Sequence, residues 1–155
     1  MFVRQIESRD FDQVIELART MKEEAPCYRD YAFNQYKVAG LCQVCLDDPD
    51  WICIVTENDD GELVGFTAAG CVEMLFGHDR FVEDLCFYVQ PKYRGSSAAL
   101  RMMNMLESWS TSIGAKAMRL GITTGTNPAQ AGKFLTRQGF SETGGLYTKT
   151  ICPLP

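Results

Sequence analysis

Hydrophobic and polar residues follow two rhythms along this chain, and the two rhythms predict strands and helices. Short apolar runs, several of them alternating with polar residues, are typical of strands. They cover residues 2–7, 51–58, 62–74, 80–89, 117–124 and 146–151, and a further short strand is expected near Phe140. Apolar residues spaced by three and four, typical of helices, cover about 10–25, 31–46, 97–113 and 127–138. This order predicts one α/β layered domain over residues 1–155, with a mixed central sheet of six to seven strands and four flanking helices.

Composition narrows the class of protein. The chain has 155 residues, a net charge of −5 and no cluster of Lys and Arg, so nucleic acid is not an expected partner. No apolar run reaches the roughly 18 residues of a membrane span, and the N-terminus lacks the pattern of a secretory signal. The seven cysteines lie mostly inside apolar patterns, which suits a reducing compartment, so we expect a cytoplasmic protein.

Cys42 and Cys45 have the Cys-x-x-Cys spacing of some metal and redox sites. A zinc site would need two more ligands at suitable spacing, and His78 is the only histidine. Both cysteines also fit the apolar positions of the helix over 31–46. We therefore interpret them as buried helix residues and expect no metal.

The stretch "YRGSSAAL", from Tyr93 to Leu100, lies where a strand ends and a helix begins. The first amides of a helix have no partner within the helix, and the helix dipole favours negative charge there. Small side chains leave those amides open to phosphate oxygens, and Arg94 adds positive charge. An ordinary helix start with a serine cap is the alternative interpretation.

At this point the sequence resembles a family. "VQPKYRGSSAAL" is similar to the acyl-CoA-binding motif of the GNAT N-acetyltransferase superfamily, Arg/Gln-x-x-Gly-x-Gly/Ala. Arg94 fills its first position, Ser97 replaces the central glycine and Ala99 fits the last. "NPAQAGKFLTRQGF" is similar to the family's later helix with its Gly-Phe end, and "FVRQIESRDFDQVIEL" to its first strand and helix.

The resemblance implies a site for acetyl-CoA, or another acyl-CoA, between the strand ending at Val89 and the strand beginning at Ala117. Backbone groups of the first strand would pair with the pantetheine arm, and amides of the helix start would hold the pyrophosphate. The implied cofactor-binding residues are Phe87, Tyr88, Val89, Arg94, Gly95, Ser96, Ser97, Ala98, Ala99 and Asn127. Asn127, followed by Pro128, also has the pattern of a helix N-cap.

Two residues depart from the family pattern. A serine at position 97 keeps its backbone amide, so the phosphate contact survives if its φ angle is negative; a positive φ would add strain of roughly 1–2 kcal/mol. Leu135 occupies the position where the family often has a tyrosine that protonates the leaving thiolate. Tyr147 and Tyr88 are candidates to replace that tyrosine, and we predict Tyr147 as the catalytic acid.

An amine acceptor must lose a proton before it attacks a thioester. We predict Glu83 as the base, with Asp84 in reserve. Alternation along the strand 80–89 would put Glu83, Leu85, Phe87 and Val89 on one face and Asp84, Cys86 and Tyr88 on the other. Burial at the rim of a site would raise the pKa of such a carboxylate.

The sequence thus predicts an N-acetyltransferase that acts on an amine of a small molecule or a protein. The alternative is a CoA-binding or regulatory protein that keeps the fold without turnover. The loops 26–32 and 74–80 and the segment 141–147 would surround the acceptor, and acidic residues near them suggest a cationic acceptor. The last strand would offer an edge for a homodimer.

Overall fold

Five strands form one sheet in the order β1-β2-β3-β4-β5. The structure is a computed structural model that describes residues 1–149 and 151. Neighbouring strands are antiparallel except β4 and β5, which are parallel. In chain order the elements are β1 (Phe2–Gln5), the 3-10 turn η1 (Ser8–Asp10), α1 (Phe11–Glu24), α2 (Gln35–Asp47), β2 (Trp51–Glu57), β3 (Leu63–Glu73), β4 (Arg80–Val89), the 3-10 turn η2 (Pro91–Tyr93), α3 (Ala98–Ser112), β5 (Ala117–Arg119) and α4 (Pro128–Arg137).

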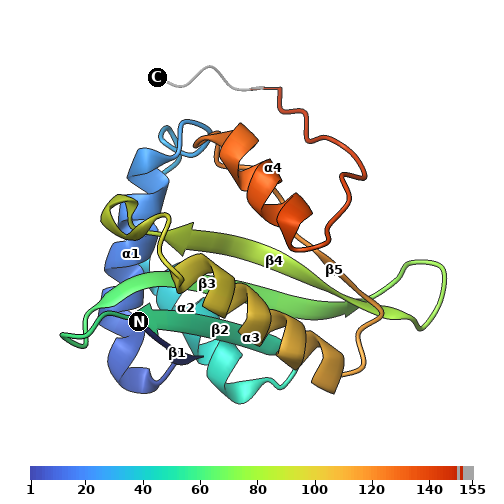
Figure 1. Cartoon of the computed structure of the whole chain (residues 1–155), viewed down its shortest axis with the longest axis horizontal. Coiled ribbons are helices and arrows are strands. Elements are labelled where there is room, and N and C mark those ends of the chain that lie inside the picture. The colour runs from blue at the N-terminus through green and yellow to red at the C-terminus, as the bar shows by residue number, and fades with distance from the viewer. Residues whose placement is uncertain (150, 152–155) are drawn as a thin grey trace.

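Helices cover both faces of the sheet (Figure 1). On one face α1 and α2 pack on β2, β3 and β4 through a cluster that includes Val14, Leu17 and Phe66. On the other face α3 packs through a second cluster that includes Ile54 and Met102. The α/β class and the four helices expected from the sequence are confirmed.

The helix α4 lies apart from these layers, above the end of β4 in Figure 1, and has no fully buried residue. Phe134 of α4 contacts the sheet, with its ring 6.3 Å from the ring of Phe87 on β4.

A network of charged groups joins β1 to the start of α1. Arg4 donates to both carboxylate oxygens of Asp10, at 2.6 and 2.9 Å, and to Glu57 on β2. Asp10 is only 2% exposed, and it also accepts from the backbone amide of Glu7 at 2.7 Å. The hydrogen bond from Arg4 is the largest cause that lowers the pKa of Asp10.

The number of strands predicted from the sequence was too high. The structure has five strands in its described part, and residues 120–124 and the described residues of 146–151 form none. β5 pairs with β4 over only three residues, so its edge offers a short template for another strand. Gly144 and Gly145 precede the expected last strand, and glycine adds backbone entropy that pairing must offset.

The expected alternation along β4 is wrong beyond Asp84. Ala69 of β3 pairs with Asp84, but its neighbour Ala68 pairs with Cys86, so Leu85 is an extra residue in a β-bulge. A bulge shifts the side-chain alternation by one residue. Asp84 therefore shares the α3 face of β4 with Phe87, whereas Glu83 lies on the opposite face, and Leu85 is 53% exposed.

Cys42 and Cys45 are buried in α2, at 2% and 1% exposure, as interpreted from the sequence. Burial raises the pKa of Cys42 to about 11 and that of Cys45 to about 12, so both thiols stay protonated near neutral pH. Among residues 1–149 and 151, no group of three or more His, Cys, Asp or Glu side chains is placed to hold a metal ion. No helix in the same residues has the length and apolar character needed to cross a membrane.

Candidate active site

The two parallel strands β4 and β5 separate after three residue pairs, the last of which is Glu83 with Arg119. From Asp84 to Val89, β4 has no strand beside it on that edge within the described chain. The carbonyl oxygen of Val89 accepts from Nε of Arg94 at 2.9 Å, so it points away from β3. The edge of β4 from Asp84 to Val89 is therefore open, and its backbone groups can bond to a ligand that lies between β4 and the chain after β5.

The turn from β4 into α3 leaves several amides without a partner. Gly95 has φ +83°, a left-handed conformation that favours glycine, and it lets the chain reverse into α3. Ser97 has φ −75° and ψ −1°, so the serine sits in ordinary helical geometry without strain. Within the described residues the amides of Gly95, Ser97, Ala99 and Leu100 donate no hydrogen bond, and those of Arg94, Ser96 and Ala98 are satisfied within the turn. The exposed start of α3 can therefore accept an anion.

The side chain of Arg94 does not point freely into this turn. Its guanidinium binds both carboxylate oxygens of Glu24 at the end of α1, at 2.5 and 2.7 Å. Tyr88 donates its hydroxyl to the same carboxylate at 3.1 Å, and burial raises the pKa of Tyr88 to about 12. The hydrogen bond from Arg94 is the largest cause that lowers the pKa of Glu24. The charge that the sequence assigned to the phosphate site is thus paired in the structure.

Two carboxylates lie where the strands separate, on opposite faces of β4. Glu83 is exposed, whereas Asp84 is half-buried and accepts a hydrogen bond from the amide of Gly121 at 2.8 Å. Burial raises the pKa of Asp84 to about 6, although the Gly121 amide partly opposes that shift. Asp84, the reserve candidate from the sequence, is therefore a carboxylate with the fixed position and the raised pKa that suit a base.

The remaining predicted residues lie further along the chain. Asn127 precedes α4 in a left-handed conformation, φ 46°, and its side chain donates to Gln130 at 2.7 Å instead of capping the helix. Leu135 is half-buried on α4. Tyr147 follows α4 in a segment without helix or strand, and its side chain is 95% exposed. The structure thus does not bring the side chains of Tyr147 and Asn127 together with Glu83.

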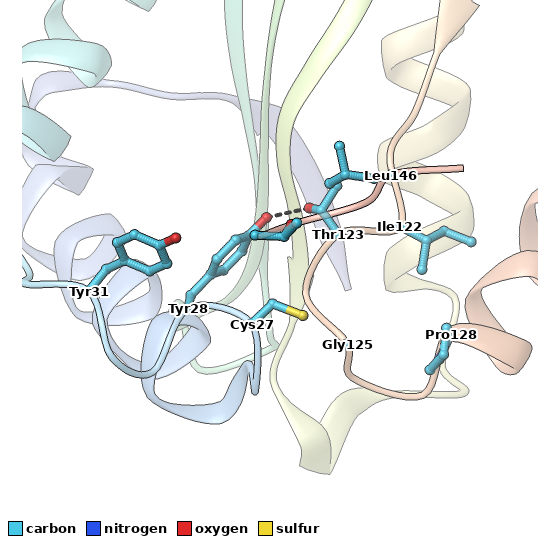
Figure 2. A pocket seen from close by; sticks show the side chains of 9 residues that line it. Cys27, Tyr28, Tyr31, Ile122, Thr123, Gly125, Pro128 and Leu146 are labelled. Atoms are coloured by element: carbon cyan, nitrogen blue, oxygen red, sulfur yellow. Dashed lines mark hydrogen bonds between the residues drawn. The ribbon is translucent and has the colours of Figure 1, made fainter. Parts of the chain in front are cut away.

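A cavity of about 540 Å³ opens beside this region, between the α1–α2 loop and the segments that follow β5 and α4. Cys27, Tyr28 and Tyr31 come from the loop, Ile122 and Pro128 from the chain after β5, and Leu146 from the segment after α4 (Figure 2). Thr123, Gly125 and Thr148 complete the lining. The loop is tied across the opening by a hydrogen bond between the hydroxyls of Tyr28 and Thr123 and by the amide of Cys27, which donates to the carbonyl of Thr124 at 3.2 Å.

The sequence predicted that the loop 26–32 would border the acceptor, but it did not predict which residues of other segments this loop would contact. Tyr28 and Thr123 are 95 residues apart, and Glu24 and Arg94 are 70 residues apart. No local pattern signals such pairs. The two tyrosines of the loop could have indicated a binding surface, since Tyr and Trp are amphipathic residues favoured at such surfaces.

The motif "YRGSSAAL" predicted a helix start with open amides, and the structure places such a helix start beside the point where β4 and β5 separate. The sequence matches the acetyltransferase (GNAT) family over residues 8–140. The chain belongs to this family. The resemblance inferred from the sequence is therefore confirmed.

Solved structures of other acetyltransferases have the same fold as this GNAT protein. Glucosamine-6-phosphate N-acetyltransferase from Arabidopsis thaliana is 14% identical, with a TM-score of 0.76 over 97% of this chain and 98% of that chain. Ribosomal-protein-alanine N-acetyltransferase from Brucella melitensis biovar Abortus is 15% identical, with a TM-score of 0.72 over 97% and 100%. AAC(6')-Iy, solved with a bisubstrate analogue of CoA and acetylneamine, is 17% identical, with a TM-score of 0.76 over 97% and 98%. No curated protein sequence matches this chain.

Proposed function

We propose that this GNAT protein is an N-acetyltransferase that moves the acetyl group of acetyl-CoA to an amine. The observation that carries the proposal is the open edge of β4 from Asp84 to Val89, which leads directly to the unpartnered amides at the start of α3. An extended ligand that ends in phosphates could pair its arm with the open edge of β4 and its phosphates with the amides at the start of α3.

The residues present fit such a cofactor. Phe87 and Val89 supply backbone groups on the open edge, and the amides of Gly95, Ser97 and Ala99 supply donors for phosphate oxygens. Ser97 is exposed and its φ is negative, so it leaves the approach to its own amide unstrained. Bound acetyl-CoA would supply the acetyl group as a thioester. Asn127 and the remaining residues predicted from the sequence would border it from α4 and the turn.

The new bond joins the acceptor nitrogen to the acetyl carbon, and the bond between that carbon and sulfur breaks. A neutral primary amine loses one proton from its nitrogen as the new bond forms, and a protonated amine must lose another proton before it can attack. We propose that Asp84 accepts such a proton on the carboxylate oxygen that is not held by Gly121. Glu83, on the other face of β4, is the alternative base predicted from the sequence.

The sulfur leaves as a thiolate and takes up a proton. Tyr147 is the residue proposed from the sequence to supply it, and its neighbours Leu146 and Thr148 line the cavity. Tyr88 is less suited, because its hydroxyl is engaged by Glu24. A thiol has a pKa near 8.5, so its thiolate leaves readily, and water can provide the proton where no side chain does.

A reducing, cytoplasmic location accompanies this proposal. The six cysteines in the described residues are all free thiols, which agrees with a compartment that keeps cysteines reduced.

Thermal unfolding with and without acetyl-CoA tests the cofactor, with AMP as the control. A ligand at 100 times its dissociation constant stabilises the folded state by about 2.7 kcal/mol, which raises the midpoint by several degrees in a domain of about this size. Release of free CoA with a panel of amines then tests turnover. A shift without CoA release from any amine would favour a CoA-binding protein without turnover. No shift at millimolar acetyl-CoA would rule out the acetyltransferase and leave a regulatory protein that keeps the fold.

A further inference from the structure

The cavity of about 540 Å³ has an unusual lining for a site that would receive a charged amine. None of its nine lining residues is charged: three are aliphatic or proline, two are tyrosines, two are threonines, and the others are Cys27 and Gly125. Arg29 and Asp30 lie between the two tyrosines in sequence, but both are exposed and neither lines the cavity. The acidic residues that suggested a cationic acceptor are therefore not part of this lining, and Glu24 is paired with Arg94.

The lining argues against two types of acceptor. A sugar phosphate needs Arg, Lys or open helix amides near its phosphate, and a molecule with several ammonium groups needs several carboxylates. The nine residues themselves offer neither type a charged partner, and the charged residues Arg119, Lys133 and Glu142 belong to the adjoining hollow that also includes Ile122 and Leu146. The volume falls within the range of roughly 300–1,000 Å³ typical of small-molecule sites.

The tyrosines present apolar surface to the cavity. The hydroxyl of Tyr28 is already bonded to Thr123, so its polar end is satisfied and its ring remains as a wall (Figure 2). Tyr31 lies beside it on the same loop, and Ile122, Pro128 and Leu146 line the cavity from the segments that follow β5 and α4. An aromatic or aliphatic body between these two sides would be in contact with apolar groups on both.

One carboxylate is linked by a hydrogen bond to the residue that precedes a member of the lining. Asp84 is bonded to the amide of Gly121, the residue immediately before Ile122. A single ammonium group could thus approach Asp84 while the body of the molecule stays in the uncharged cavity.

We propose that the acceptor is a small primary amine that carries one ammonium group on an apolar, preferably aromatic, body. The proposal rests on the proposed acetyltransferase function and names its substrate class. Tyr31 is the specificity-determining residue whose contribution is simplest to measure, because it is 63% exposed and its truncation should disturb the fold little.

Release of CoA at fixed acetyl-CoA should be compared for 2-phenylethylamine, spermidine, glucosamine 6-phosphate, an aminoglycoside and a peptide with N-terminal alanine. The expected result is the highest kcat/KM for 2-phenylethylamine. A higher kcat/KM for any of the other four would overturn the proposal.

The variant Tyr31→Ala should lower kcat/KM for 2-phenylethylamine about tenfold, equivalent to about 1.4 kcal/mol of binding, and leave the dissociation constant of acetyl-CoA unchanged. Tyr36→Ala is the matched control, because Tyr36 is 79% exposed on α2 and does not line the cavity. It should change kcat/KM less than twofold, and equal effects of both variants would count against the cavity.

Binding of 2-phenylethylamine, measured by calorimetry in the presence of CoA, separates this proposal from the proposed function. If no amine releases CoA, the acetyltransferase function fails, but saturable binding that Tyr31→Ala weakens still supports the cavity as a site for such amines. If the wild-type protein shows no saturable binding at millimolar amine, the substrate class is wrong.

Discussion

The guanidinium of Arg94 and the carboxylate of Glu24 form a two-point ion pair that joins the turn before α3 to the end of α1. Arg94 also lies over the ring of Tyr88, with its central carbon 5.7 Å from the ring centroid. Because its charge is neutralised by Glu24, Arg94 contributes little net positive charge to the proposed phosphate site. Backbone amides and the dipole of α3 would then be the main attraction for a phosphate there.

Replacing the carboxylate, in Glu24→Gln, should therefore have opposite effects on cofactor affinity and on stability. The freed Arg94 should bind acetyl-CoA several-fold more tightly, with a steeper dependence on salt. The free energy of unfolding at pH 7 should fall by about 1 kcal/mol, since both partners are partly exposed. Glu24 has a lowered pKa, so this contribution is present above its ordinary value near 4.5 and is lost as the pH falls through the lowered value.

Calorimetry and urea unfolding at pH 7 and pH 4 measure both effects. Glu23→Gln, which changes the exposed neighbour, is the control and should alter neither quantity. Weaker binding of acetyl-CoA by Glu24→Gln would show that the ion pair positions the turn instead of competing with the phosphate.

A second prediction concerns Asp84 as a base. Asp84→Asn should lower kcat about 100-fold, within the usual range for loss of a general base, whereas Glu83→Gln should lower it less than threefold. In the wild-type protein, kcat/KM of the proposed reaction should fall as the pH drops below about 6, because burial raises the pKa of Asp84 to about 6 and the protonated acid accepts no proton. Steady-state kinetics from pH 5 to 9 tests both statements, and the reverse ranking of the two variants would assign the base to Glu83.

The same Asp84→Asn variant should be more stable than the wild type at high pH. The pKa of Asp84 is higher in the folded state than its ordinary value of 3.8, so the folded state binds more protons and wild-type stability falls as the pH rises from about 4 to 6. Asparagine keeps an oxygen for the Gly121 amide without the charge. The variant should thus melt at a higher temperature at pH 8 and near the wild-type temperature at pH 4; equal melting temperatures at pH 8 would contradict the raised pKa.

The third prediction distinguishes the roles of Gly95 and Ser97 in the turn before α3. Gly95→Ala places a side chain at φ +83° and should cost about 1–2 kcal/mol of stability. Ser97→Gly changes a residue with an ordinary φ, so it should change the dissociation constant of acetyl-CoA less than threefold. Urea unfolding and calorimetry measure the two quantities. A large gain in affinity for Ser97→Gly would mean that the serine side chain obstructs the phosphate.

The fourth prediction tests the network of Arg4. Arg4→Met leaves the carboxylate of Asp10 buried without its partner and should cost about 3 kcal/mol. The pKa of Asp10 is lowered in the wild type, so the stability it provides is lost as the pH falls, and the difference between wild type and variant should shrink in acid. Urea unfolding from pH 7 to 3 checks this. Arg4→Met combined with Asp10→Asn should recover part of the loss, whereas additive losses would exclude direct coupling.

Much of the fold follows from local patterns. The period of the apolar residues located all four helices and the first four strands to within a few residues, because α1, α2 and α3 each bury one face against the sheet. The strand expected over 117–124 is paired only to Arg119, and nothing in its own sequence indicates that β4 turns away.

The candidate site was less predictable than the fold, because several of its features depend on contacts between distant segments. The motif from Tyr93 to Leu100 is local, so its role as a helix start with open amides could be inferred. The bulge at Leu85 depends on the register with β3, and a shift of one residue reverses which carboxylate faces α3. The pairing of Arg94 with Glu24 and the bond between Tyr28 and Thr123 depend on tertiary packing that a single sequence does not encode in any short pattern.

The pairing of β4 with β5 over only three residues also affects the local stability of the chain that follows β5. The described residues after Arg119 are tied to the rest of the molecule by the hydrogen bond from the Gly121 amide to Asp84 and by the two hydrogen bonds of the α1–α2 loop to Thr123 and Thr124. The ring of Phe134 adds a contact with Phe87. Segments with so little buried surface have the lowest free energy of local unfolding, so their amides exchange with solvent before those of the sheet. A ligand that bridges β4 and α4 would have to order this segment as it binds, and part of its binding energy would be converted into protection of the α4 amides from exchange.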